Sequence, residues 1–329
     1  MDYHSSWTLV HARLHQTLRK RQLLPKQAKI LIALSGGQDS LCLSKLLLDL
    51  QSKWQWQIAI AHCDHRWSSD TGITEHVQQI VQTWNVPFYL QVAESLSETE
   101  AAARVWRYQA LTEIAEAQGL QYVVTGHTKS DRAETLLYNL VRGAGADGLS
   151  ALTWQRPLTS AITLVRPILN FTRRETFDFC QQFQLPIWFD VANHNLKYAR
   201  NRIRADLIPY LQTNFNFRVE NSLAQTAELL RADVEYLEET ARQCFNQAIS
   251  PTGNQLNRII LKNLPLALQR RVIRQYLTLL IGKAANFEQI EAVRDLISAP
   301  NRTRTSTLSG NVVVEVIEDW LVLQKINQN

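Results

Sequence analysis

The chain has 329 residues, 45% of them apolar and 20% charged, with a formal net charge of +5 and a sequence pI of about 9.0. This composition is ordinary for a globular protein, and the length is enough for two domains. No apolar run approaches the roughly 18 residues that a membrane-spanning helix needs, so we predict no membrane association. The mildly basic charge suits a nucleic-acid partner without requiring one.

Cysteine usage indicates a reducing compartment. The four cysteines are widely separated and form no CxxC pair: Cys42, Cys63, Cys180 and Cys244. This spacing argues against a zinc ribbon, an iron–sulfur site and a disulfide framework. The N-terminus contains His4, His11 and Arg13 and has no apolar core of a secretory signal, so we predict a cytoplasmic protein.

The first predicted elements are a helix over residues 1–25 and a buried strand over Ile30–Leu34. Ser35-Gly36-Gly37 ends the strand. Asp39 and Ser40 are then expected to cap a helix whose leucines recur at helical spacing. A strand, a glycine turn and a helix N-terminus together predict an anion-binding site.

The residues of this turn narrow the choice of anionic ligand. Both GxxxxGK[ST] and GxGxxG are absent, which excludes a P-loop and a dinucleotide fingerprint. The turn is instead similar to the SGGxDS signature of the PP-loop ATP pyrophosphatases, which implies cleavage of ATP between its α and β phosphates. A carboxylate beside a phosphate cradle suits bridging Mg²⁺. The predicted nucleotide contacts here are Ser35, Gly36, Gly37, Gln38, Asp39 and Ser40, with Gln38 at the variable position.

A second strand, Gln57–Ala61, leads into His62-Cys63-Asp64-His65. Polar site residues gather at the carboxyl ends of parallel strands, so we predict that His62 and Asp64 line the nucleotide site. The HxDH spacing could hold a metal, but no third ligand is evident. A solvated turn is the plain alternative.

A helix at about residues 70–85 and a strand over Pro87–Val92 come next. The following helix, Glu100–Leu111, places Arg104, Arg107 and Tyr108 on one face. Two arginines and a tyrosine could bind phosphate and stack on a base. Periodicity alone favours a solvated face with the tyrosine in the core.

The next strand, Gln121–Gly126, is followed by His127 and by a helix from about Asp131 to Leu140. We predict that Gly126 and His127 contact the nucleotide. Asp39, Asp64 and Asp131 should then lie at one sheet edge, with enough carboxylates to hold Mg²⁺ against phosphates.

Alternating strands and helices predict a doubly wound α/β fold with a parallel sheet. A strand over Ala161–Val165 and a helix over Arg173–Gln184 continue it, and three arginines follow within Arg200–Arg204. From about residue 216 the chain becomes mainly helical. Helices are expected near residues 219–248, 264–280 and 287–298, followed by a β-hairpin of 303–308 with 312–324. The predicted domains are therefore residues 1–215 and residues 216–329, the second an RNA-docking or an oligomerisation module.

Taken together, these blocks resemble the tRNA(Ile)-lysidine synthetase family. The resemblance runs from Lys29 to about Leu211 and is most specific in Gly126–Leu149 and Tyr198–Leu211. It implies that ATP adenylates the C2 oxygen of the wobble cytidine in a CAU-anticodon tRNA(Ile), and that L-lysine then attacks carbon-2 and displaces AMP. Mg²⁺ is implied at Asp39 and Asp131. Our predicted catalytic group is Asp39, Asp131, Arg107 and Arg202, and a homodimer is left open.

The chain departs from the family pattern at a few positions. Ser130 and Arg132 replace Asp and Gln in the block around Asp131, and Phe189 and Ala192 replace Glu and Ser in a block where Asp190 and Asn193 match. Two alternative functions fit parts of this pattern. One is a tRNA thiolase, which would need cysteines to carry sulfur or to hold a cluster, and the other is a tRNA-binding protein without catalytic activity. The second predicts a damaged loop, whereas the SGGxDS residues are intact.

Overall fold

The computed structural model describes residues 7–67, 71–97, 99–150, 152–189 and 196–325. The chain forms two compact units, Met1–Arg231 and Ala232–Asn329. Their boundary falls inside α10 (Val219–Ala248). The domain boundary at residue 216 stays a prediction. None of the described helices is long and apolar enough to cross a bilayer.

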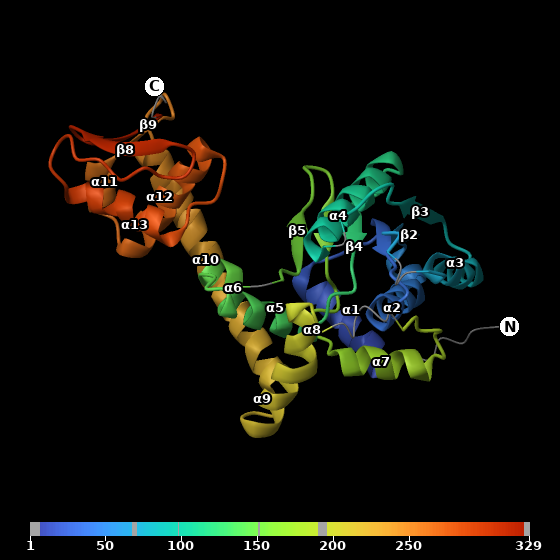
Figure 1. Cartoon of the computed structure of the whole chain (residues 1–329). Coiled ribbons are helices and arrows are strands. Elements are labelled where there is room, and N and C mark those ends of the chain that lie inside the picture. The colour runs from blue at the N-terminus through green and yellow to red at the C-terminus, as the bar shows by residue number, and fades with distance from the viewer. Residues whose placement is uncertain (1–6, 68–70, 98, 151, 190–195, 326–329) are drawn as a thin grey trace. The chain divides into compact units, whose positions relative to one another are not determined.

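The first unit is built on a mostly parallel sheet, which confirms the predicted fold class (Figure 1). Within the described residues the strand order is β3-β2-β1-β4-β6-β5, and only β5 runs antiparallel. The strands are β1 (Lys29–Ala33), β2 (Gln57–Asp64), β3 (Phe88–Val92), β4 (Tyr122–Val124), β5 (Gln155–Pro157) and β6 (Thr163–Val165). Sequence analysis missed β5 because it has three residues and ends in proline, which is tolerated only at a sheet edge.

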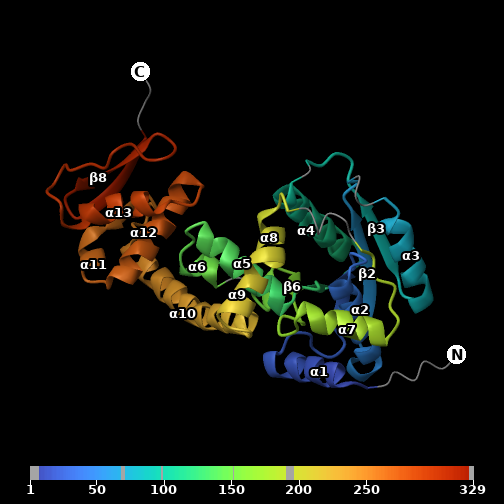
Figure 2. The same ribbon diagram turned by 60° about the horizontal axis from the view of Figure 1, so that its bottom comes forward.

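Alternate residues of each strand enter separate cores. Ile30 and Ile32 pack with α1, α2, α3 and α7 on one face, whereas Leu31 packs with α4 on the other (Figure 2). Both faces of β1 are buried, which explains why its sequence is continuously apolar. The bounds are α1 (Leu9–Arg21), α2 (Gln38–Trp54), α3 (Ile73–Trp84), α4 (Glu100–Ala117) and α7 (Arg173–Gln182).

A smaller core joins α5 (Lys129–Val141) to the start of α10. Ala133 and Leu137 pack against Ile203 and Ile208, with Leu223 at the rim. Along the chain, the short helical elements between α5 and α10 are α6 (Ala146–Leu149), α8 (Ala199–Arg202), a π-helical turn (Ile203–Leu207) and α9 (Ile208–Asn214). The first part of α10 therefore belongs to the core of the first unit.

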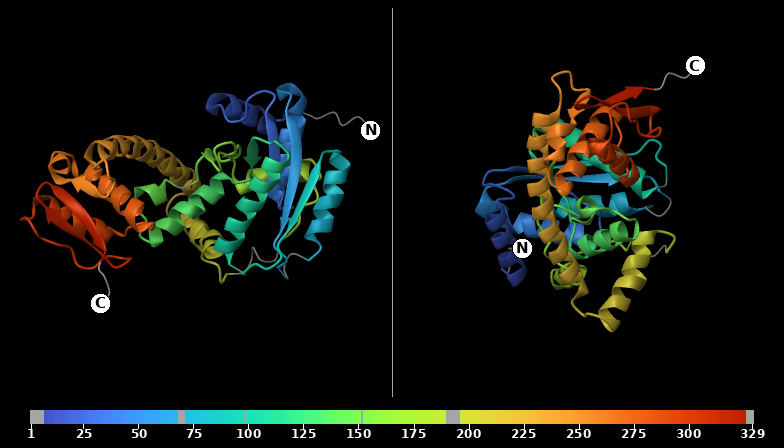
Figure 3. Two further views of the ribbon diagram at one scale, coloured as in Figure 1. Left: turned by 90° about the horizontal axis from the view of Figure 1, so that it is seen from above. Right: turned by 90° about the vertical axis from the view of Figure 1, so that its left-hand side faces the viewer.

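The second unit combines helices with an antiparallel sheet (Figure 3). The three strands of this sheet have the order β7-β9-β8. Its elements are β7 (Gln255–Asn257), α11 (Arg258–Lys262), α12 (Leu266–Ile281), α13 (Phe287–Asp295), a 3₁₀ turn (Leu296–Ser298), β8 (Val312–Ile317) and β9 (Trp320–Lys325).

The predicted C-terminal hairpin is confirmed only in part, because its second segment, 312–324, itself contains a hairpin. β8 pairs with β9 through a turn at Glu318-Asp319. Residues 303–308 are joined to β8 by isolated bridges at Arg304 and Leu308 and by backbone hydrogen bonds of Thr303 and Thr305. Alternation in 303–308 rests on one buried side chain, Leu308, but β8 buries three valines on one face. β8 and β9 pair along their whole length and therefore form the continuous hairpin.

Candidate active site

The carboxyl ends of β1, β2 and β4 are neighbours, because β1 pairs with β2 on one side and with β4 on the other. The strand order reverses around β1, and ligands of doubly wound sheets bind at such switch points. Asp64 is the last residue of β2, and the segments that follow β1 and β4 carry Asp39 and His127. The sheet thus brings the predicted site segments to one edge.

The loop Ser35–Gly37 links β1 to α2. Helix α2 begins at Gln38 with Gly37 as its N-cap, so the expectation that Asp39 and Ser40 cap it was wrong. Gly37 provides no side-chain cap, and the first N–H groups of α2 are left for an anion. Ser40 instead braces the loop: its hydroxyl accepts from the Ser35 N–H at 3.2 Å and donates to the Gly37 carbonyl at 2.9 Å.

Two glycines are required by close contacts. Gly36 has φ +80°, a conformation that favours glycine, and a Cβ there would lie 3.3 Å from the side chains of Trp188 and Val77. A Cβ on Gly126 would lie 2.9 Å from the backbone of Asp39 and Ser40. The chain after β4 therefore packs directly on the first turn of α2, and Gly126 acts by its small size.

Asp39 and Asp131 share one guanidinium, that of Arg173 at the start of α7. Arg173 Nη2 donates to Asp131 Oδ1 at 2.9 Å, and its Nε lies 3.5 Å from Asp39 Oδ2. Thr176 donates to Asp39 Oδ1 at 2.5 Å. Asp131 Oδ2 accepts from the N–H and the hydroxyl of Thr128, which caps α5. Both carboxylates are thus held in fixed positions.

These neighbours move the two carboxyl pKa values in opposite directions. Burial raises the pKa of Asp39 to about 6, and Arg173 only partly opposes it. Burial would also raise the pKa of Asp131. Arg173, His127 and the Thr128 hydrogen bonds outweigh that effect and lower the Asp131 pKa below its ordinary value. The pKa of Arg173 is raised, because the two carboxylates outweigh its burial. Asp131 is therefore firmly ionised, whereas Asp39 responds to any added cation.

Gln38, the first residue of α2, connects the nucleotide loop to α7. Its Nε2 donates to the Arg173 carbonyl at 2.7 Å and to the Thr176 hydroxyl at 3.2 Å. A position that the sequence marked as variable therefore joins α2 to α7.

The two predicted histidines lie at this edge, where His62 is buried and His127 is half-buried. His62 is 3% exposed, and its Nδ1 lies 2.8 Å from the Leu34 carbonyl. His127 Nδ1 lies 2.9 Å from the Thr125 hydroxyl. Burial, helped by the charge of Arg166, lowers the pKa of His127 to about 3. His127 is therefore neutral at physiological pH and offers a hydrogen bond rather than a charge.

Asp64 takes a different set of partners. It accepts from the Arg66 N–H at 2.7 Å and from the Thr74 hydroxyl at 3.0 Å. The structure thus brings together two of the three predicted carboxylates, Asp39 and Asp131. Among the described residues, no cluster of three or more His, Cys, Asp or Glu has the arrangement of a metal site.

The two predicted catalytic arginines differ in their surroundings. The charge of Arg107, on α4, lowers the pKa values of both His65 and His127, after burial, which places it near this edge. Tyr108 is buried, as periodicity indicated. Arg202 is exposed and donates to the carbonyls of Leu196 and Lys197, at 2.7 and 2.9 Å. Asp190 and Asn193 lie outside the described residues.

Sequence analysis missed Arg173, the residue that joins the two carboxylates. Its signal was Thr172-Arg-Arg-Glu175, a capping box that places Arg173 at the first position of α7. It also missed the pair of Glu134, 3% exposed, with Arg204 at 2.8 Å.

Three of the four cysteine thiols have a raised pKa: Cys42, Cys63 and Cys180. Burial raises the thiol pKa values of Cys63 and Cys180 to about 12, which keeps both protonated at neutral pH. All four cysteines are free, and Cys42 and Cys180 are buried.

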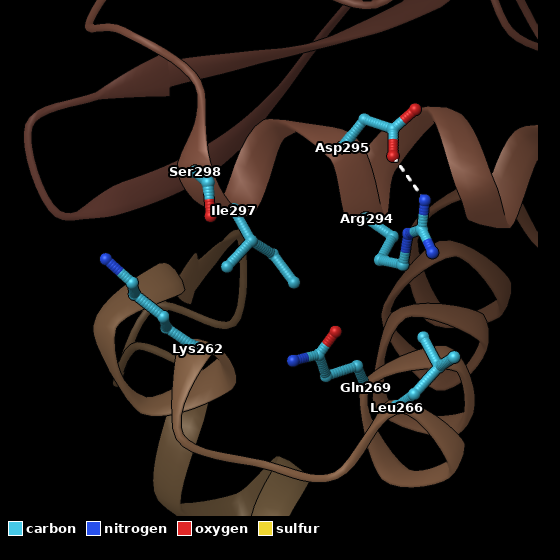
Figure 4. A pocket seen from close by; sticks show the side chains of 7 residues that line it. All are labelled: Lys262, Leu266, Gln269, Arg294, Asp295, Ile297 and Ser298. Carbon is cyan, nitrogen blue, oxygen red and sulfur yellow. Dashed lines mark hydrogen bonds and ion pairs between the residues drawn. The ribbon is translucent and has the colours of Figure 1, made fainter.

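A separate pocket of about 320 Å³ lies within the second unit (Figure 4). It is polar at its rim, and the Arg294 guanidinium in it is paired with Asp295. Its lining residues are Lys262, Leu266, Gln269, Arg294, Asp295, Ile297 and Ser298. None of them belongs to the predicted nucleotide site.

Two protein-family models match the chain, one in each of its two units. A PP-loop domain family matches residues 8–211, and a TilS-like substrate binding domain family matches residues 251–323. The chain is 56% identical to a tRNA(Ile)-lysidine synthase of Nostoc sp., over 97% of each chain. It is 52% identical to the Synechocystis sp. tRNA(Ile)-lysidine synthase, over 96% of this chain and 98% of that protein.

A solved structure shares the fold of the first unit. The U34-tRNA thiolase NcsA from Methanococcus maripaludis matches with a TM-score of 0.58 at 16% identity, covering 68% of this chain and 78% of that one. At this identity the match supports the PP-loop fold alone.

Proposed function

Because the chain belongs to the tRNA(Ile)-lysidine synthase family, we propose that it is a ligase that uses ATP to attach lysine to carbon-2 of the wobble cytidine in tRNA(Ile) with a CAU anticodon. The modified tRNA reads AUA in place of AUG. ATP first adenylates the cytosine C2 oxygen with release of pyrophosphate, and the lysine amine then displaces AMP. The observation that carries the proposal is the near-complete match to these synthases together with an intact SGGQDS loop.

The loop and its surroundings suit ATP. The uncapped N-terminus of α2 offers N–H groups to phosphate, and Gly36, Gly37 and Gly126 leave the backbone open to close approach. His62 and the neutral His127 line this edge. Arg107 supplies a positive charge near the same edge. That charge would stabilise the negative charge that pyrophosphate carries as it leaves.

The donor set also suits Mg²⁺, which typically takes one or two carboxylates and completes its shell with substrate phosphates and water. Asp39 Oδ2 and Asp131 Oδ1 face the same guanidinium, so a cation already lies between them. These two carboxylates would hold the ion, which would neutralise charge on the phosphates. Thr176 and Thr128 orient the carboxylates by binding their other oxygens.

The remaining assignments rest on the family. We place tRNA binding in the second unit, which matches the substrate-binding family, and Arg202 beside the bound substrate. L-lysine as co-substrate, a cytoplasmic location and a homodimer stay predictions. The thiolase rival is disfavoured by the buried, protonated cysteines and by the identity of the relatives.

Incorporation of labelled lysine into tRNA(Ile) tests the proposal. We expect lysine to enter the CAU-anticodon tRNA(Ile) only with ATP, with AMP and pyrophosphate as products. Initiator tRNA(Met), which has the same anticodon, is the matched control and should stay unlabelled. Sulfur transfer without lysine incorporation would overturn the assignment.

A further inference from the structure

Arg173 has a fixed backbone and a side chain that reaches solvent. Its N–H donates to the Ser130 hydroxyl at 3.2 Å, and its carbonyl accepts from Gln38 at 2.7 Å. The Thr172–Glu175 capping box fixes the start of α7 around it. The side chain itself is 30% exposed. The guanidinium can therefore turn without any movement of the helix.

The two carboxylates that Arg173 joins have one committed oxygen each. Asp39 Oδ1 accepts from Thr176, and Asp131 Oδ2 accepts twice from Thr128. The other oxygens, Asp39 Oδ2 and Asp131 Oδ1, face Arg173 at 3.5 and 2.9 Å. Any divalent cation held by this pair needs the oxygens that the guanidinium now uses.

A divalent ion bound to these two oxygens would lie beside the guanidinium that uses the same oxygens. Two positive charges so close together repel each other strongly. We propose that Arg173 occupies the metal position in the nucleotide-free enzyme, so that the metal ion enters only together with ATP. The phosphates give the displaced guanidinium a new partner, since arginine pairs well with phosphate oxygens. This inference rests on the proposed ATP and Mg²⁺ chemistry of Asp39 and Asp131.

The arrangement couples the two ligands thermodynamically. A metal ion that binds alone must displace Arg173 without compensation. An ion that binds with nucleotide displaces a guanidinium that the phosphates already attract. Each ligand therefore raises the affinity for the other, by the same factor in both directions. Removal of the guanidinium should strengthen metal binding to the empty enzyme and weaken this coupling.

The test measures Mn²⁺ binding to the full-length chain by electron paramagnetic resonance, with and without α,β-methylene-ATP, which resists cleavage. We expect Arg173→Gln to bind Mn²⁺ alone about tenfold more tightly than the wild type, within the range of about 5- to 150-fold for coupled ligands. The ratio of Mn²⁺ affinities with and without the analogue should fall correspondingly. Equal nucleotide-free affinity in wild type and variant overturns the proposal.

Arg174→Gln is the matched control, because Arg174 is 80% exposed and pairs only locally, with Asp178. It should bind Mn²⁺ like the wild type. Should Arg173→Gln fail to fold, Arg173→Lys replaces it: a lysine lacks the fork that serves both carboxylates, so nucleotide-free Mn²⁺ affinity should still rise, though less. An unchanged affinity in that variant also overturns the proposal.

Asp39→Asn separates this inference from the function on which it rests. Loss of Mn²⁺ binding in Asp39→Asn with no effect of Arg173→Gln leaves the metal site standing and refutes the role of Arg173. Unchanged Mn²⁺ binding in Asp39→Asn, with the analogue present, refutes the metal site itself and the inference with it.

Discussion

The two units hold their charges in different ways. At the edge of the six-stranded sheet, Asp39 and Asp131 are less than one-fifth exposed and share Arg173. In the second unit, most of the ion pairs lie along helix surfaces, such as Arg270 with Glu291 and Arg274 with Glu238, although Glu315 on β8 is buried and pairs with Arg304. Buried charges are little screened and have fixed geometry, whereas exposed charges are screened by salt.

This contrast matches two kinds of ligand. A small, highly charged ligand such as a nucleotide–metal complex needs a few charges in fixed positions. A long polyanion such as tRNA is bound by many exposed cations, each contributing a small, salt-dependent increment. The comparison therefore predicts that single substitutions have large effects in the first unit and small effects in the second.

The largest effect is expected from Asp39→Asn. The change removes a proposed metal ligand beside the phosphate cradle, so the rate of lysine attachment should fall at least about a hundredfold, as for loss of one electrostatic stabilising group. The affinity for tRNA, measured by filter binding, should stay within about twofold, since it is expected to come mainly from many exposed cations. Asp178→Asn, a half-exposed carboxylate on α7, is the control and should keep full activity. Activity that survives Asp39→Asn would refute the metal role.

Gly126→Ala should be the most destabilising of these changes. The added methyl group would lie 2.9 Å from the backbone of Asp39 and Ser40, which cannot yield as a flexible side chain would. We expect a loss of about 3 kcal/mol in the free energy of unfolding by urea, the upper range for overpacking.

Gly145→Ala is the matched control for that substitution, because a Cβ there meets no atom within 4 Å and φ is −69°. Its free energy of unfolding should change by no more than about 0.5 kcal/mol. Equal effects of the two substitutions would mean that the contact between Gly126 and α2 is not tight in solution.

Arg132→Gln tests a buried charge away from the nucleotide loop. Arg132 is 4% exposed, donates to the Leu152 carbonyl and pairs with Glu228 at 2.7 Å. Its replacement leaves the Leu152 carbonyl without its charged donor and removes one of the two arginines that pair with Glu228, the other being Arg21. It should cost about 2 kcal/mol of unfolding free energy.

This cost should depend on pH. Burial alone would raise the pKa of Glu228, but Arg132 and Arg21 outweigh it and lower that pKa below its ordinary value of 4.5. The stabilisation from a carboxylate with a lowered pKa is fully present above the unfolded value and is lost as pH falls through the folded value. Urea unfolding at pH 7 and below pH 4 should therefore show a smaller gap between wild type and Arg132→Gln in acid. A gap independent of pH would contradict the assigned ion pair.

The smallest effect is expected in the second unit, at the pocket residue Lys262 (Figure 4). If Lys262 contacts one tRNA phosphate, Lys262→Gln should reduce the slope of log affinity against log salt by about 0.9. Lys26→Gln, the same charge change in the first unit, should leave the slope unchanged. An identical slope in wild type and Lys262→Gln would remove this residue from the tRNA surface.

Local sequence was sufficient for the nucleotide loop and for most of the sheet. An apolar run, two glycines and a leucine-spaced helix specify β1, the loop and α2 because each signal lies within a few residues of the next. The C-terminal hairpin was harder to predict, because the alternation of residues 312–324 continues across the turn at Glu318-Asp319. That turn divides the segment into β8 and β9, which pair with each other.

By itself, the sequence predicted that Asp39 and Asp131 lie close together, since both follow strands that end at one sheet edge. Tertiary structure alone decided how they are joined. Arg173 is distant from both in the sequence, and only the packing of α7 against α2 brings its guanidinium between them. Asp64 lies at the same edge yet turns to Thr74, because a side chain's partners depend on the helices packed around the strand as well as on the strand's position.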